Sequence, residues 1–377
     1  MQTLLQHYRG SLIFTAICLG LGVWLGFEQG QGWVGMLELM WIVVVLSILE
    51  ISLSFDNAVV NATVLRDMSE KWQWRFLTWG IAIAVFGMRI VFPLAIVAIA
   101  ANLGPIDALN LSLNDPERYE AIVSGAHIGI AGFGGAFLTM VGLNYFFGAD
   151  KEVHWIAVVE RFLVKVSVVK AAEIGLLLLA LYFISLMLDD ADALTFLVAG
   201  ILGLVTYLVV DAIGTLLDLA DRKKMAEGAV RSGLGGFLYL EVLDASFSFD
   251  GVIGAFALTN NMLVIALGLS IGAMFVRSMT IHLVRAGTLA QYRYLENGAF
   301  WAIIVLGAIM LLSAVFHIPE TITGLLGATL IGISLYWSIR HNRKYGDSDS
   351  EPVTSPPSAG ADPPRVPPPP AGTGDRA

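Results

Sequence analysis

Glu50-Ile-Ser-Leu-Ser-Phe-Asp56-Asn57 lies in a long apolar run of the chain and is nearly repeated as Asp244-Ala-Ser-Phe-Ser-Phe-Asp250-Gly251. Aligned without a gap, Glu50 matches Asp244 and Asp56 matches Asp250. A carboxylate inside a membrane costs about 2.5–3.5 kcal/mol on insertion scales. Two copies of an acidic motif in apolar surroundings therefore need a compensating role, and an ion pathway is such a role.

The composition predicts a membrane protein made of helices. The chain has 377 residues, of which 56% are hydrophobic and 14% charged, with a mean hydropathy of +0.74, whereas soluble domains carry about 25% charged residues. Ten apolar segments are long enough to span a bilayer: 11–27, 33–65, 77–101, 121–147, 163–188, 193–217, 233–259, 262–286, 297–317 and 322–340. We therefore expect an all-α, polytopic transmembrane bundle of about ten helices, with segment 33–65 bent or broken at the acidic motif.

Loop charges orient these segments. Alternate connections hold nearly all the loop Lys and Arg, so the positive-inside rule places both termini in the cytoplasm. Segments 33–65 and 233–259, which carry the two acidic motifs, then cross the membrane in opposite directions. Arg89 matches Arg277 and Gly80 matches Gly268 in the segments that follow. The sequence thus predicts an inverted-topology repeat of three-helix units, about 33–147 and 233–317, flanked by segments 11–27 and 322–340.

The chain divides into a transmembrane domain, 1–345, and a tail, 346–377, that is rich in Pro, Ser, Gly and Asp. Such a tail is predicted to be disordered, and binding of a partner is the alternative to a solvated tail. The net charge of −9 gives no reason to expect nucleic-acid binding, and the single cysteine excludes an intrachain disulfide. A homo-oligomer stays open.

The side chains of the two motifs predict an ion site. On an ideal helix Glu50, Ser54, Asn57 and Asn61 share one face. The predicted cation ligands are Glu50, Asp56, Asn57, Asp244 and Asp250, supported by Ser54, Asn61 and Ser248. Carboxylate, amide and hydroxyl oxygens suit Mg²⁺, Ca²⁺ or Mn²⁺.

Arg89 and Arg277 fall near the middle of their segments. They are expected to pair with the acids in the absence of a cation and to leave them when one binds, which would couple occupancy to conformation. The alternative is that acids and arginines form static salt bridges that fix helix packing.

The motifs Ser54-Phe-Asp-Asn57 and Ser248-Phe-Asp-Gly251 resemble those of the TerC family, named for tellurium resistance. The resemblance covers about 33–340. It implies a multi-helix protein of the bacterial cytoplasmic (inner) membrane, related to the lysine-exporter superfamily. Several relatives in the family are associated with manganese or calcium efflux. It carries over Asp56, Asn57 and Asp250 first, then Glu50 and Asp244.

These observations predict a secondary transporter that exports a divalent cation, Mn²⁺ before Ca²⁺, with no bound cofactor. A membrane scaffold or assembly factor linked to metal or tellurite stress is the alternative. An intramembrane enzyme is not expected, because no nucleophile and base accompany the carboxylates.

Overall fold

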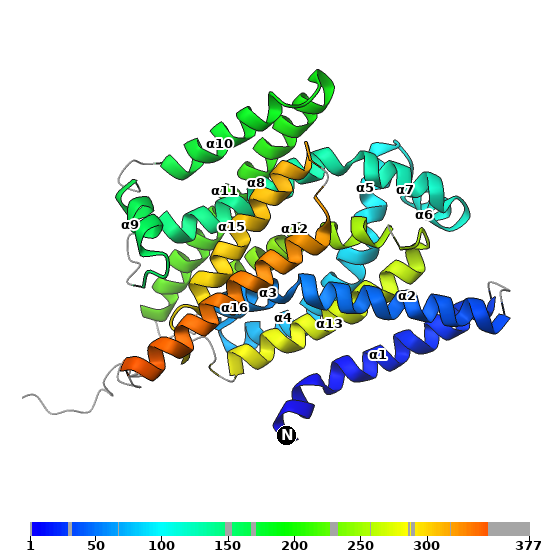
Figure 1. Cartoon of the computed structure of the whole chain (residues 1–377), viewed down its shortest axis with the longest axis horizontal. Helices are drawn as coiled ribbons and strands as arrows, with labels where there is room; N and C mark the ends of the chain where they lie inside the picture. The colour runs from blue at the N-terminus through cyan, green and yellow to red at the C-terminus, as the bar shows by residue number, and fades with distance from the viewer. Residues whose placement is uncertain are drawn as a thin grey trace, which may run out of the picture.

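The structure is a computed structural model of the chain. It describes residues 2–28, 32–66, 68–147, 153–166, 171–226, 233–256, 258–285, 287, 291–316 and 318–345. Within these ranges the chain forms helices joined by short turns and contains no strand (Figure 1). The tail predicted to be disordered, 346–377, lies outside the described residues.

The helices follow the apolar runs of the sequence. They are α1 (Gln2–Glu28), α2 (Gly32–Leu53), α3 (Phe55–Arg66), α4 (Glu70–Ala82), the π-helix η1 (Ile83–Val91), α5 (Phe92–Ala100), α6 (Pro105–Asn114), α7 (Pro116–Gly125), α8 (His127–Phe147), α9 (Ala157–Val166), α10 (Ala172–Ser185), α11 (Asp190–Ala226), α12 (Leu234–Phe256), α13 (Met262–Arg285), α15 (Leu295–Ser313) and α16 (Glu320–Tyr345). Lipid offers the backbone no hydrogen-bond partners, whereas a helix pairs its backbone N–H and C=O groups within itself. Apolar runs of this length therefore form helices.

Eight helical stretches in the described part of the chain are long and apolar enough to cross a membrane. Two predicted spans are not among them. The helix α12 has 23 residues but carries Glu241, Asp244 and Asp250, and α10 has only 14 residues. The prediction of an all-α, polytopic helical bundle is confirmed.

The predicted break in segment 33–65 is confirmed and falls at Ser54. The helix α2 ends at Leu53 and α3 begins at Phe55, so Glu50 and Asp56 stand on either side of the break. The amide of Ser54 still donates to the carbonyl of Glu50 at 3.0 Å. In the second copy Gly251 permits unwinding, but α12 runs unbroken from Leu234 to Phe256.

The span that carries Arg89 is also irregular, because its middle part is the nine-residue π-helix η1. Pro93 follows four residues after Arg89 and has no N–H to donate to the Arg89 carbonyl. The lost hydrogen bond and the ring of Pro93 favour a change in helical register at this point. Short π-helical stretches inside α-helices occur often at functional sites.

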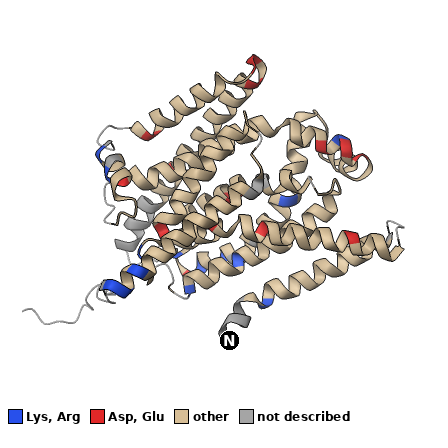
Figure 2. Cartoon of the chain, viewed as in Figure 1, with Lys and Arg blue, Asp and Glu red and all other residues tan. Residues whose placement is uncertain are grey.

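Packing brings the two acidic motifs into the centre of the bundle. The helix α8 packs between α11 and α15, while α13 packs against α1, α2 and α3. The flanking helix α16 packs against α15 and also against α2 and α3 on both sides of the Ser54 break. Figure 1 shows α16 lying along α3. Most of the described Lys and Arg gather towards one end of the bundle, at the lower left of Figure 2.

A further acid, Glu160 on α9, lies away from this centre and is fully buried. It accepts hydrogen bonds from the backbone N–H of Ile156 at 3.0 Å, from Asn297 Nδ2 at 3.1 Å and from Trp301 Nε1 at 3.0 Å. Its charge is thereby solvated by fixed donors, and the acid fastens α9 to α15.

Candidate ion-binding site

Arg89 is the centre of the first cluster. It is 4% exposed, and its guanidinium forms a salt bridge with Glu50, which is 3% exposed. Its other terminal nitrogen donates to Ser248 Oγ on α12. Ser54 donates to Glu50 Oε1 at 3.2 Å. One arginine therefore joins the acid of the first motif to a hydroxyl of the second.

Arg277 on α13 is the centre of the second cluster and is also 4% exposed. Its Nη2 atom lies 3.5 Å from Asp244 Oδ2 and 3.7 Å from Glu241 Oε1. Its Nη1 atom donates to the Phe76 carbonyl at 2.9 Å, and the guanidinium lies 4.2 Å from the centre of the Phe76 ring. One guanidinium is thus shared by two carboxylates.

The two clusters contain equivalent contacts. The Arg277–Asp244 pair corresponds to the Arg89–Glu50 pair when the motifs are aligned. Gly80 approaches Glu241, and the equivalent Gly268 approaches Ser47, whose hydroxyl donates to the Gly268 carbonyl at 3.0 Å. Two related units would make such paired contacts.

Asn57 connects the first motif directly to the second. Its Nδ2 atom donates to Asp244 Oδ1 at 2.8 Å. Its Oδ1 atom is buried and has no hydrogen-bond donor among the described residues, and the same is true of Asn61 Oδ1 one turn further along α3. Two buried amide oxygens therefore have free acceptor capacity, which is unusual in a protein interior.

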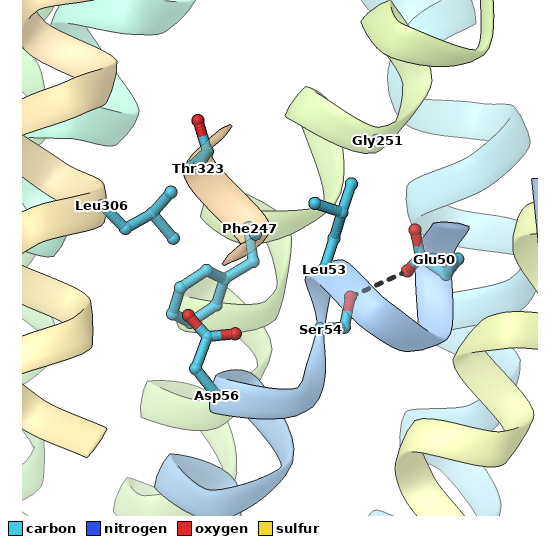
Figure 3. A pocket seen from close by; sticks show the side chains of 9 residues that line it. Glu50, Leu53, Ser54, Asp56, Phe247, Gly251, Leu306 and Thr323 are labelled. Carbon is cyan, nitrogen blue, oxygen red and sulfur yellow. Dashed lines mark hydrogen bonds between the residues drawn. The ribbon is translucent and has the colours of Figure 1, made fainter. Parts of the chain in front are cut away.

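Asp56 lies on the other side of the Ser54 break, in a small pocket of about 30 Å³ (Figure 3). Its side chain points towards Phe247 and Leu306, while Glu50 lies across the break beside Ser54. Asp56 is 5% exposed and accepts a hydrogen bond from the backbone N–H of Asn57 at 2.9 Å. No described Lys or Arg forms a salt bridge with it.

The predicted ligands do not form one compact cluster. Among the described residues, no three side chains of His, Cys, Asp or Glu are placed so that they could hold a metal ion together. Glu50 is paired with Arg89, and Asp244 is paired with Arg277 and Asn57. Asp56 lines a small pocket that Glu50 also lines, but neither Arg89 nor Arg277 forms a salt bridge with it. The backbone of Asp250 belongs to α12, but its side chain lies outside the described residues.

Sequence matching missed Glu241, which is 8% exposed and has no hydrogen-bond donor within the described part of the chain for either carboxylate oxygen. It lies three residues before Asp244 on the same helix, so the two carboxylates share a face. The residue that matches it in the first copy is Ser47. A search for identical pairs passes over such a position, whereas the i, i+3 spacing of two acids in an apolar helix would have found it.

With Glu241 included, the two clusters and the Asp56 pocket together hold four carboxylates and two guanidinium groups among the described side chains. These are Glu50, Asp56, Glu241 and Asp244, with Arg89 and Arg277. When all are ionised, the formal net charge is −2. A divalent cation would balance it, and the available donor atoms are oxygens, which hard cations prefer.

Comparison with known proteins gives one family. Residues 55–345 match a family described as a protein of unknown function (DUF475). Searches of curated proteins and of solved structures give no match. The match does not name TerC, so that resemblance stays a prediction from the motifs. Because the matched residues make up most of the chain, the chain belongs to the DUF475 family.

Proposed function

We propose that this protein is a secondary transporter that exports a divalent cation across the bacterial cytoplasmic membrane, with both termini in the cytoplasm. Mn²⁺ is the first candidate and Ca²⁺ the second, as the TerC resemblance implies. The substrate passes between α2 and α3 on one side and α12 and α13 on the other, where the two acidic motifs meet.

The broken span between Glu50 and Asp56 carries the proposal. Discontinuous helices near the middle of the membrane are typical of ion and substrate sites in secondary transporters, because the interrupted backbone and nearby side chains can bind the substrate there. Two buried acids flank this break, and α16 covers it. A helix that served only as a membrane anchor would need neither acid.

The chemistry of the donors supports a hard cation. Around Asp244 and Asn57 the atoms with acceptor capacity are carboxylate and amide oxygens. Soft metals such as Cu⁺ prefer sulfur, and Zn²⁺ sites usually use His or Cys. A cation that reaches these oxygens must displace at least one guanidinium, because Arg89 and Arg277 are already paired with Glu50 and Asp244.

Transport into liposomes tests the proposal. The purified full chain is reconstituted, and uptake of Mn²⁺ and of Ca²⁺ is measured with a gradient of each ion. We expect the wild type to move Mn²⁺ and Asp56→Asn to lose most of that activity. Asp107 is an exposed acid on α6, so Asp107→Asn is the matched control and should transport as the wild type does.

Two results would contradict the proposal. If liposomes that contain the wild type move neither cation under any gradient, the chain is not a transporter of these ions. The hypothesis of a membrane scaffold or assembly factor is then the better one. If Asp56→Asn and the double variant Asp56→Asn/Asp250→Asn transport as well as the wild type, the site is wrong. Expression in a host that lacks its own manganese efflux, with cellular Mn measured, gives the same comparison in cells.

A further inference from the structure

We propose that Glu241 is a positioning residue of the cation site, which takes over the guanidinium of Arg277 when a cation binds to Asp244. This inference rests on the proposed function and makes it more specific. It assigns the exchange of guanidinium for cation to Asp244 and leaves Glu50 as the permanent partner of Arg89.

The geometry of Arg277 allows this exchange. Its Nη2 atom is 3.5 Å from Asp244 and 3.7 Å from Glu241, so it lies almost midway between the two acids. The other terminal nitrogen is held by the Phe76 carbonyl at 2.9 Å, and the Phe76 ring packs against the guanidinium. A small rotation about this anchor would move Nη2 from one carboxylate to the other.

The carboxylate of Glu241 has free acceptor capacity for the guanidinium of Arg277. Both of its oxygens are buried without a hydrogen-bond donor among the described side chains and backbone groups. Among the described residues, the charged groups that face it are Arg277 on α13 and Asp244 on its own helix, while α4 presents the uncharged Gly80. A carboxylate in this position gains a charge-assisted hydrogen bond when Arg277 turns towards it.

Asp244 then becomes available to a hard cation. Its Oδ2 atom loses Arg277, and its Oδ1 atom remains next to Asn57 at 2.8 Å. The Asn57 amide also offers an oxygen that has no donor in the described part of the chain. Carboxylate and amide oxygens from α12 and α3 would together bind the cation.

In the first cluster, Arg89 has no second carboxylate among the described residues to which it could move. The residue that matches Glu241 is Ser47, and its hydroxyl donates to the carbonyls of Val43 at 2.7 Å and Gly268 at 3.0 Å. Arg89 is bound to Glu50 and to the neutral Ser248. If a cation took Glu50, no second carboxylate among the described residues would be in contact with Arg89, so its charge would be buried without compensation.

Binding of Mn²⁺ to the purified full chain in detergent tests the exchange. We expect Glu241→Gln to fold, because Arg277 keeps Asp244, but to bind Mn²⁺ about tenfold more weakly or worse, which corresponds to ~1.4 kcal/mol. Glu241→Asp, which keeps the charge, should recover part of the affinity. In an Arg277→Gln background, adding Glu241→Gln should have no further effect. Glu117→Gln, an exposed acid on α7, is the control.

Stability gives an independent readout that does not need the metal. Asp244→Asn should cost little thermal stability, because Glu241 can still neutralise Arg277. Glu50→Gln should lower the melting temperature clearly more, since Arg89 then has no carboxylate in contact. Equal losses in the two variants would overturn the asymmetry, including in the case that Glu241→Gln fails to fold.

The outcomes also separate this inference from the proposed function. If the wild type binds Mn²⁺ and Glu241→Gln binds it equally well, the role of Glu241 is wrong while transport through the site stands. If Glu241→Gln weakens binding by the same factor with and without Arg277, Glu241 does not act through Arg277. If the wild type neither binds nor moves Mn²⁺ or Ca²⁺, both the proposed function and this inference fall.

Discussion

Replacing Gly80 by Ala tests how closely α4 approaches the Arg277 cluster. A Cβ atom built on Gly80 would lie 2.5 Å from Arg277 Nη1 and 2.6 Å from Glu241 Oε1. Favourable contacts between heavy atoms are about 3.5–4.0 Å apart. The methyl group would therefore occupy the space between the two charged groups, and both would have to move by about 1 Å or separate.

Two effects of opposite sign decide the size of the change. Alanine is favoured over glycine inside a helix by about 1 kcal/mol. Loss of one partner of a buried ion pair costs about 3–5 kcal/mol, which is an upper bound for an ion pair that is pushed apart. Arg277 cannot simply retreat, because its Nη1 atom is held by the Phe76 carbonyl. We expect Gly80→Ala to lower the free energy of unfolding, by an amount whose upper limit is the difference between these two effects, about 2–4 kcal/mol.

The assay is unfolding of the purified chain in mixed detergent micelles with increasing denaturing detergent. Gly175→Ala on α10 is the matched control, because nothing lies within 4 Å of a Cβ at Gly175. That variant should be as stable as the wild type or more stable by up to ~1 kcal/mol. If Gly80→Ala is as stable as Gly175→Ala, the close packing of α4 on the ion pair is wrong.

Three further predictions concern other parts of the chain. Glu160→Gln should lower the free energy of unfolding by about 2–4 kcal/mol, because one amide oxygen cannot satisfy the donors that surround this buried acid; an unchanged value would contradict that account. Gly327→Ala on α16 should reduce Mn²⁺ transport at least severalfold, because its Cβ would lie 3.0 Å from Asp56 Oδ2, whereas Gly332→Ala, with nothing within 4 Å, should transport normally. Deletion of 346–377 should leave transport unchanged, and loss of function on deletion would favour the scaffold reading.

Apolar length and motif spacing were sufficient to predict the helices and the break. Segment 33–65 is too long for one straight span, and its polar residues are concentrated at the point where the structure breaks it, at Ser54. The matching arginines predicted that buried charge would be compensated, because an unpaired acid in a membrane is costly. Arg89 and Arg277 contact Glu50 and Asp244 accordingly.

The packing of elements far apart in the sequence could not be predicted in this way. The helix α16 was expected to flank the repeat, yet its Gly324 and Gly327 lie against Leu53 and Asp56 at the break. The lengths and charges of intervening loops do not determine which face of a helix meets another. The π-helical register of η1 likewise depends on its tertiary surroundings as well as on Pro93.

The positions where the two motifs differ are the ones that complete each cluster. Asn57 reaches Asp244 with its amide, but the matching residue Gly251 has no side chain to offer Glu50. Glu50 Oε2 instead lies 2.8 Å from the place where a Cβ at Gly251 would stand. The longer acid therefore fills the room that the missing side chain leaves, and Arg89 becomes its main partner.

In the second cluster the shorter Asp244 leaves room for Asn57 on one side and for Arg277 on the other, with Glu241 beside it. Duplication alone would give two equal sites with two equally fixed salt bridges. The position that holds Ser47 in the first motif holds Glu241 in the second. Arg277 therefore lies near two described carboxylates, whereas Arg89 lies near one. In the proposed exchange only Arg277 leaves its acid, so the two halves of the site respond differently to a bound cation, while the ion gradients set the direction of net transport.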